Sequence, residues 1–182
     1  MTLPLTHHTA LERPDLLAPP VEAALRTLPW ADQVQVAAID ASLADTAQFC
    51  AAYGIELADS ANCVIIAGRR GGEVSYAACM VTATSRADVN GVVRQRLGAR
   101  KASFGPVDVV TELTGMEFGG ITPVGLPGAW PVLVDELVAK NPRVVIGSGI
   151  RGSKLWLAGS LLASLPGAEV LPGLGLEAGP PR

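Results

Sequence analysis

Two glycine-rich loops hold the residues of this sequence whose types and spacing suit ligand chemistry. Paired glycines let main-chain N–H and C=O groups approach a ligand with no side chain in the way. Basic side chains beside such a loop suit a phosphate or a carboxylate. Each loop by itself is also compatible with an ordinary tight connection. The first loop contains Gly119, Gly120, Ile121, Thr122 and Pro123, and the second contains Gly147, Ser148 and Gly149, followed by Arg151 and Lys154.

The usual catalytic and metal-binding constellations lack support in the sequence. His7 and His8 are the only histidines, and they lie in a segment that we expect to be loose. A Ser–His or Cys–His pair is therefore not indicated, because the base must reach the nucleophile. Cys50, Cys63 and Cys79 are odd in number and widely spaced, which predicts buried, reduced thiols and a cytoplasmic protein. Without a zinc pattern, a phosphate loop or a dinucleotide fingerprint, we expect no metal and no cofactor.

The composition limits the kinds of partner. Of 182 residues, 49% are hydrophobic and 4% aromatic, which suits one domain with an aliphatic core. A formal net charge of −3 argues against a large, sequence-independent surface for nucleic-acid phosphates, which would need a basic face. It permits binding to only the end of an RNA. Apolar runs are strand-length and no signal-peptide core is present, so we expect no membrane association. Six basic residues are read either as solvated faces or as contacts to an RNA acceptor stem: Arg69, Arg70, Arg94, Arg96, Arg100 and Lys101.

Behind these loops, strand-like and helix-like segments alternate. We expect a loose segment over 1–20, one domain over 21–170 and a tail over 171–182, because both ends are rich in proline, glycine and small residues. Hairpin-joined strands mixed with helices predict an α/β domain of α+β character, with a mixed sheet flanked by helices. Predicted strands are Gln33–Ile39, Asn62–Ala67, Glu73–Thr82, Lys101–Phe104, Val132–Val134, Arg143–Gly147 and Leu155–Leu157, and predicted helices are Val21–Leu28, Asp45–Tyr53, Asp88–Leu97, Pro106–Leu113 and Ser160–Leu165.

Local signals define several of these boundaries. Asp45 and Asp88 are natural N-caps for the helices that follow them. Gly54 stands in the position where a left-handed residue ends a helix. The run Gly68–Gly72 predicts a hairpin loop between two strands, because glycine supplies the positive φ that such turns need.

In this order and at this separation, the two loops resemble the paired signatures of the YbaK/ProX aminoacyl-tRNA deacylases, which include the editing insert of prolyl-tRNA synthetases. Gly119–Pro123 is similar to the family's GxxxP loop and Gly147–Gly149 to its GxG loop. Thr46–Gly54 resembles its T-x-x-x-A-A-x-x-G helix, with Cys50 in place of the first alanine. Arg86, in the Arg-Ala-Asp run before the next helix, also matches and could face the site or only solvent. The resemblance implies a mixed, mostly antiparallel sheet flanked by helices.

One departure from the family pattern concerns its working lysine. Members typically carry that lysine at the start of the strand after the Thr46–Gly54 helix, and the matching residue here is Asn62. An ammonium can neutralise a phosphate or polarise an ester carbonyl, whereas an amide offers hydrogen bonds without charge. The residue pattern alone favours a different interpretation, in which Asn62 is a turn or strand-edge residue that caps backbone groups.

The resemblance implies a trans-acting enzyme that hydrolyses the ester of a mischarged tRNA, with the tRNA 3′ end as partner. It places Asn62, Gly147, Ser148 and Gly149 in the catalytic region, while Gly119–Pro123 would bind substrate together with Arg86, Arg151 and Lys154. The family's chemistry is thought to use the ligand's ribose hydroxyl and a water, which fits a chain without a triad. Two alternatives stay open: a binder that lost hydrolysis with the lysine, and a structural or regulatory interaction domain.

Overall fold

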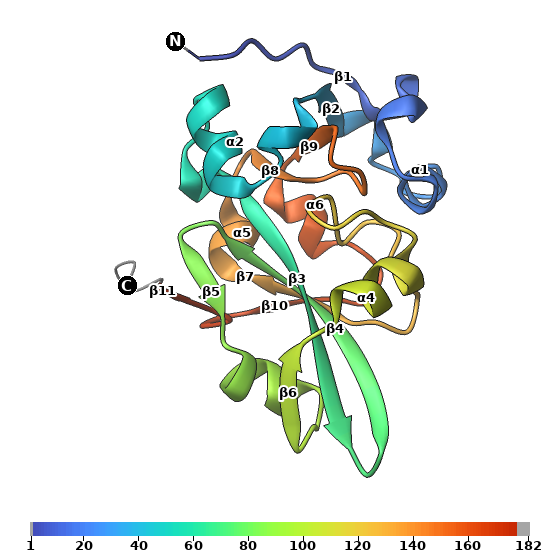
Figure 1. Cartoon of the computed structure of the whole chain (residues 1–182), viewed down its shortest axis with the longest axis vertical. Helices are drawn as coiled ribbons and strands as arrows, with labels where there is room; N and C mark the ends of the chain where they lie inside the picture. Colours follow the sequence, from blue (N-terminus) through green and yellow to red (C-terminus); the bar gives the residue numbers. More distant parts are fainter. Residues whose placement is uncertain (1, 178–182) are drawn as a thin grey trace.

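A computed structural model describes residues 2–177 of the chain, and its strands form two main sheets and a two-stranded ribbon (Figure 1). The four-stranded sheet has the order β1-β2-β9-β8, with strands His8–Thr9, Gln35–Ala38, Ser153–Leu157 and Val144–Gly147. The five-stranded sheet has the order β10-β7-β4-β3-β6, with strands Ala168–Leu171, Val132–Asp135, Glu73–Thr82, Ala61–Arg70 and Lys101–Phe104. The ribbon pairs β11 (Gly175–Glu177) with β5 (Ser85–Ala87).

The expected mixed, mostly antiparallel sheet structure is confirmed. Between the described strands, only the pairings of β7 with β4 and with β10 are parallel. The strands divide into two main sheets rather than one central sheet, and an isolated parallel bridge between Ser60 and Val145 connects them. That bridge places the start of β3 beside β8, so residues from both sheets meet there.

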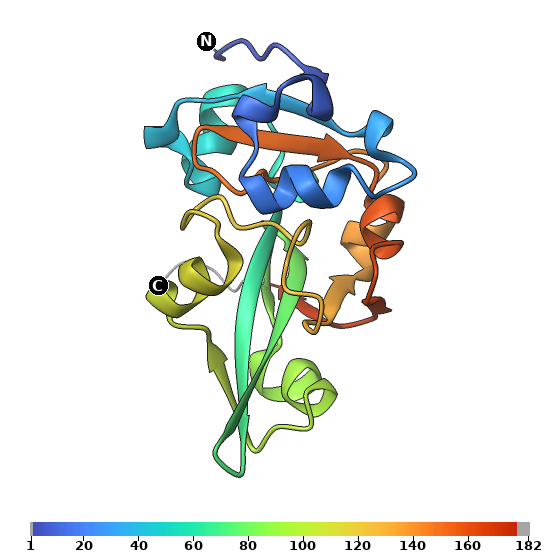
Figure 2. The same cartoon turned by 90° about the vertical axis from the view of Figure 1, so that its right-hand side faces the viewer.

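A long hairpin, β3–β4, crosses the molecule and ends far from the four-stranded sheet (Figure 1 and Figure 2). The predicted loop over Gly68–Gly72 is too long, because pairing continues to Arg70 opposite Glu73. Gly71 and Gly72 alone make the turn, with φ of 59° and 89°. Positive φ at both central residues suits the two-residue turn whose twist matches the strands.

Short helices pack beside the sheets. Asp45 caps α2 as predicted, accepting hydrogen bonds from the backbone N–H groups of Ala47 and Gln48, and Gly54 ends the helix at φ 68°. The predicted helix Asp88–Leu97 begins instead as a π turn over Val89–Val93, where both Asp88 carboxylate oxygens accept backbone N–H groups. The α-helices are α1 (Pro19–Leu25), α2 (Thr46–Tyr53), α3 (Arg94–Arg96), α4 (Val107–Thr114), α5 (Glu136–Lys140) and α6 (Gly159–Ala163). The 3-10 helices are Ala10–Glu12, Pro14–Leu16, Ala31–Gln33, Ala41–Leu43 and Leu57–Asp59.

The N-terminal segment is ordered against the four-stranded sheet, so the expectation of a loose stretch over 1–20 is wrong for its described residues. Strand β1 pairs with β2, and Ala10, Leu17 and Ala18 are buried. Burying these small and apolar side chains fixes the segment despite its prolines. Toward the other end Leu174 is buried, while residues 178–182 of the expected tail lie outside the described residues. No helix among residues 2–177 has the length and apolar character to cross a membrane.

Candidate functional site

A hollow of about 230 Å³ opens where α2, the start of β3 and the two glycine-rich loops meet. The sequence separates these segments by up to about a hundred residues, and the bridge between Ser60 and Val145 brings them together. The hollow is lined by Ala44, Asp45, Thr46, Ala61, Asn62, Cys63, Phe118, Gly119, Ile121, Gly147, Arg151 and Lys154.

Asn62 faces this hollow with a defined amide orientation. Its Oδ1 accepts a hydrogen bond of 2.7 Å from the Oγ1 of Thr46, in the first turn of α2. The pairing occupies the amide oxygen and leaves the two Nδ2–H donors for other partners. Asn62 therefore offers hydrogen-bond donors to a ligand in the hollow.

Lys154 brings a positive charge to the same hollow. It lies opposite Gly147 in the β8–β9 pairing, and its side chain is largely buried. The Nζ donates to the carbonyl of Ala44 at 3.2 Å and lies 5.4 Å from the centre of the Phe49 ring. Burial lowers the pKa of Lys154, and the nearby positive charge of Arg151 lowers it further. The amine is thus partly desolvated, a state in which its charge acts strongly on a neighbouring ligand.

Arg151 holds three segments together. Its guanidinium donates to the carbonyls of Phe118, at 3.1 Å, and Ala41, at 3.2 Å, while its backbone N–H donates to Glu117 at 2.7 Å. These contacts use several of its donors inside the protein. Arg151 consequently shapes the rim of the hollow and places a guanidinium group there.

The two glycine-rich loops pack backbone against backbone. The N–H of Gly149 donates to the carbonyl of Gly120 at 2.7 Å, so this donor is engaged between the loops. A Cβ at Gly147 would lie 2.3 Å from that carbonyl oxygen, and one at Gly120 would lie 2.5 Å from the carbonyl carbon of Ile150. Only glycine permits this approach, which explains why the loops carry glycine at both positions.

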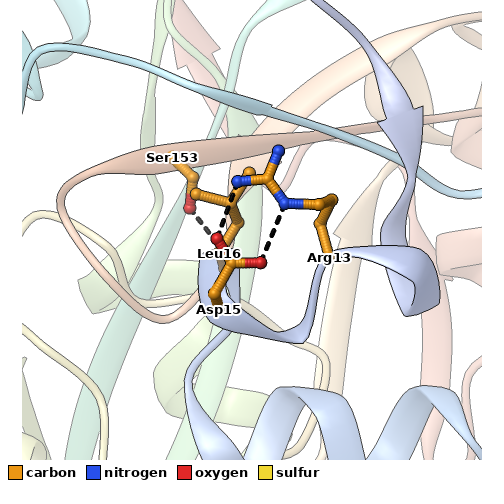
Figure 3. A network of polar contacts seen from close by, with 4 residues as sticks. All are labelled: Arg13, Asp15, Leu16 and Ser153. Atoms are coloured by element: carbon orange, nitrogen blue, oxygen red, sulfur yellow. Dashed lines mark hydrogen bonds and ion pairs between the residues drawn. The ribbon is translucent and has the colours of Figure 1, made fainter.

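Ser148 is part of the support beneath the loops. Its buried Oγ lies 2.7 Å from the Oγ of Ser153. Ser153 in turn donates to the carbonyl of Leu16 at 2.6 Å (Figure 3). In the same view, Arg13 and Asp15 pair beside Leu16. The Ser148 hydroxyl thus links the second loop to the N-terminal segment and does not line the hollow.

Five other predicted site residues also lie outside the hollow lining: Gly120 and Gly149, which are engaged between the loops, and Thr122, Pro123 and Arg86. Thr122 is fully buried, and no partner for its Oγ1 occurs among the described residues. Pro123 lines a separate hollow of about 160 Å³ beside Trp130. Arg86 is exposed on β5, opposite Leu176 of β11. The site that the structure assembles is therefore centred on Asn62 and Lys154.

Several residues of the hollow were not predicted from the sequence. Asp45 and Thr46 stand at the start of α2. Thr46 is the first residue of the helix motif that the sequence shares with the family, so this motif could have pointed to it. Phe118 is 60% exposed at the rim and precedes the first loop directly. The exposure of this ring is a property of the folded chain, and it offers a flat apolar face on which a ligand ring can stack.

The thiols of the chain are poorly suited to act as nucleophiles. Burial raises the pKa of Cys63, which lines the hollow, so its thiol stays protonated near neutral pH. Cys50 and Cys79 are buried and are likewise free thiols with raised pKa values. Among residues 2–177, no group of three or more His, Cys, Asp or Glu side chains is placed to hold a metal ion.

A protein-family model, that of the aminoacyl-tRNA editing domain, matches residues 40–165 of this sequence. The matched region includes both loops, α2 and Asn62. The chain belongs to the aminoacyl-tRNA editing domain family. The predicted YbaK/ProX relationship is thereby confirmed. No curated protein sequence matches this editing domain chain.

Solved structures agree with this assignment. A crystal structure described as a candidate trans-editing enzyme for prolyl-tRNA synthetase is 25% identical with a TM-score of 0.73, over 89% of this chain and 97% of that one. A scaffold from computational epitope grafting is also 25% identical, with a TM-score of 0.72 and the same coverage. A hypothetical protein, 22% identical over 73% of this chain and 85% of its own, has a TM-score of 0.64 and supports the fold. The predicted fold class of this editing domain is thus confirmed.

Proposed function

We propose that this protein is a trans-acting deacylase that hydrolyses the ester between a mischarged amino acid and the 3′ end of a tRNA. The observation that carries the proposal is the convergence of two donors, the Asn62 amide and the Lys154 amine, on one hollow beside the glycine loops. Membership of the aminoacyl-tRNA editing family supports the substrate class.

In the proposed reaction, water adds to the ester carbonyl and the bond to the ribose oxygen breaks, giving the free amino acid and a tRNA with a free hydroxyl. Negative charge develops on the carbonyl oxygen as water adds, and fixed donors stabilise that charge. The Nδ2–H groups of Asn62 are available for this role, and the Lys154 ammonium supplies charge nearby. The substrate's own ribose hydroxyl assists the water, so the protein supplies no nucleophile, metal or cofactor.

The rim of the hollow suits the terminal adenosine of a tRNA. Phe118 presents an exposed ring on which a base can stack, a contact worth about 1–3 kcal/mol per base. Ile121 and Cys63 offer apolar surface for the amino acid side chain. We place Gly119 and Gly147 as backbone contacts to the substrate, and we propose the cytoplasm as the site of action, since tRNA and free thiols both suit it.

A deacylation panel across mischarged tRNAs tests the proposal. Wild-type protein is expected to release the amino acid from at least one of them, and Asn62→Ala and substitutions at the packed loop glycines Gly120 and Gly147 are expected to reduce that release strongly. Asn62→Lys restores the usual family residue, and we expect turnover to be retained or raised. Gly152→Ala serves as the matched control in the second loop, because a Cβ there meets nothing within 4 Å.

One observation favours a second candidate function, a non-catalytic binder of aminoacyl-tRNA. Both cations at the hollow, Lys154 and Arg151, already donate to main-chain carbonyls. If wild type binds an aminoacyl-adenosine analogue but turns over no charged tRNA, the binder replaces the enzyme. If it neither binds nor hydrolyses, an interaction domain replaces both.

A further inference from the structure

A cationic cluster at the turn of the β3–β4 hairpin lies apart from the hollow described above. It consists of Arg69 and Arg70 at the end of β3, and of Arg100 and Lys101 at the start of β6. With Val74 and the two turn glycines these residues line an open depression of about 550 Å³. The hairpin turn forms one end of the molecule, so the cluster is open to large partners (Figure 1 and Figure 2).

Within this cluster the fold places like charges directly against each other. Arg69 and Lys101 are partners in the register of β3 and β6, and the neighbour of Arg69 on its other side is the apolar Val74. Like charges directly opposite on adjacent strands are destabilising. In the chain from residue 2 to 177, no ion pair involves any of the four basic residues, including Arg70, which lies opposite Glu73. Within the described residues, no acidic side chain therefore offsets the repulsion between Arg69 and Lys101.

Neighbouring basic residues are arranged differently. Arg96 forms an ion pair with Glu169, and the Nε of Arg94 donates to the carbonyl of Asn90 at 2.8 Å. The six basic residues that the sequence groups together therefore separate into two engaged side chains and a four-residue cluster. Within the cluster, Arg70 donates to the carbonyl of Gly98 at 3.1 Å, which anchors its side chain along the depression.

We infer that this cluster binds the sugar-phosphate backbone of a tRNA whose 3′ end occupies the hollow. The identity of the RNA rests on the proposed function, whereas the preference for a polyanion rests on the cluster itself. Asn62 and Arg69 are seven residues apart on one strand, or roughly 23 Å at about 3.3 Å per residue. The cluster therefore meets phosphates beyond the unpaired 3′ end, in the acceptor stem. A footprint of four basic residues agrees with a chain whose net charge is −3.

Binding of uncharged tRNA at several salt concentrations tests the inference directly. The variant Arg69→Gln/Arg100→Gln/Lys101→Gln is compared with Arg13→Gln/Arg26→Gln/Lys140→Gln, which removes equal charge from three ion-paired residues elsewhere. We expect the cluster variant to reduce the slope of log K against log salt by about 0.7–0.9 for each lost phosphate contact. The control variant is expected to keep the wild-type slope. Equal slopes for the two variants would overturn the inference.

Hydrolysis assays separate this inference from the proposed function. For a cluster variant that is at least as thermally stable as wild type, kcat/KM on aminoacyl-tRNA falls while hydrolysis of an aminoacyl-adenosine stays unchanged. An equal loss on both substrates contradicts the inference, because it places the defect in the hollow. If wild type hydrolyses neither substrate yet the salt slopes differ as expected, the proposed function fails and the RNA-binding surface stands.

Discussion

The Oγ1 of Thr46 donates to the Oδ1 of Asn62 at 2.7 Å, which ties the first turn of α2 to the start of β3. This bond decides which end of the Asn62 amide faces the hollow. In the proposed function, it positions the amide of the residue that stands where the resemblance implies a lysine. In the proposed reaction, an amide held in this way keeps its Nδ2–H donors available and needs little reorganisation when charge develops on the substrate.

Removing the Asn62 donors is expected to impair deacylation more than removing their support. Asn62→Ala should lower kcat about 100-fold, the size of effect seen when one fixed donor is lost. Thr46→Val should lower it only a few-fold, because a typical hydrogen bond contributes about 1 kcal/mol. Rates on one mischarged tRNA measure both. A Thr46→Val effect as large as that of Asn62→Ala would mean that Thr46 itself contacts the substrate.

Adding a methyl group at the loop contact is expected to separate the two glycine-rich loops. In Gly147→Ala the new Cβ meets the backbone of Gly120 at 2.3 Å, and backbone cannot rotate away as a side chain can. We expect a loss of about 1–3 kcal/mol in the free energy of unfolding, together with loss of ligand binding. Gly152→Ala adds the same group in open space and should leave both unchanged. Denaturant unfolding and analogue binding give the comparison, and equal effects at both glycines would contradict it.

The buried amine of Lys154 predicts a pH dependence of stability. Burial and Arg151 lower its pKa below the ordinary 10.5, while Cys50 and Asp45 partly oppose the shift. Between the lowered pKa and 10.5 the unfolded chain binds more protons than the folded one, so this group makes stability rise with pH. Lys154→Met keeps the length of the side chain without a titrating group. The difference in unfolding free energy, wild type minus variant, should therefore increase toward pH 10.5. A difference that is flat or falls with pH would contradict the buried, desolvated amine.

Replacing one member of the opposed pair at the hairpin should improve stability and weaken RNA binding together. Lys101→Glu places a carboxylate opposite Arg69, and an opposite-charge cross-strand pair contributes roughly 0.2–1 kcal/mol. Thermal unfolding is expected at a higher temperature, and tRNA affinity at low salt should fall. Lys140→Glu makes the same change in net charge on α5 and is the control for tRNA affinity; its own stability is expected to fall, because it breaks the ion pair with Glu136. A gain in both stability and tRNA affinity would show that the cluster has another purpose.

Much of the local structure follows from the sequence because its signals act over a few residues. Asp45 and Gly54 define the ends of α2 through capping and a left-handed φ, and both are confirmed. Lys101–Phe104 and Glu73–Thr82 occur as predicted strands. The predictions were wrong where local signals were ambiguous. The glycine run Gly68–Gly72 predicted a longer loop than the two-residue turn that the structure has. The prolines of the first twenty residues predicted a loose segment where the structure has a packed one.

The sequence determined the family, the mixed sheet and the candidate residues, because the order and spacing of motifs can be read along the chain without knowing how it folds. Only the tertiary structure decided which candidates meet. Strand pairing placed Lys154 opposite Gly147 and the interstrand bridge at Ser60 brought Asn62 beside them, while Ser148 turned to Ser153 beneath the loop. Such choices depend on contacts between residues far apart in the chain, where burial and hydrogen bonding, rather than local propensity, set the direction of each side chain.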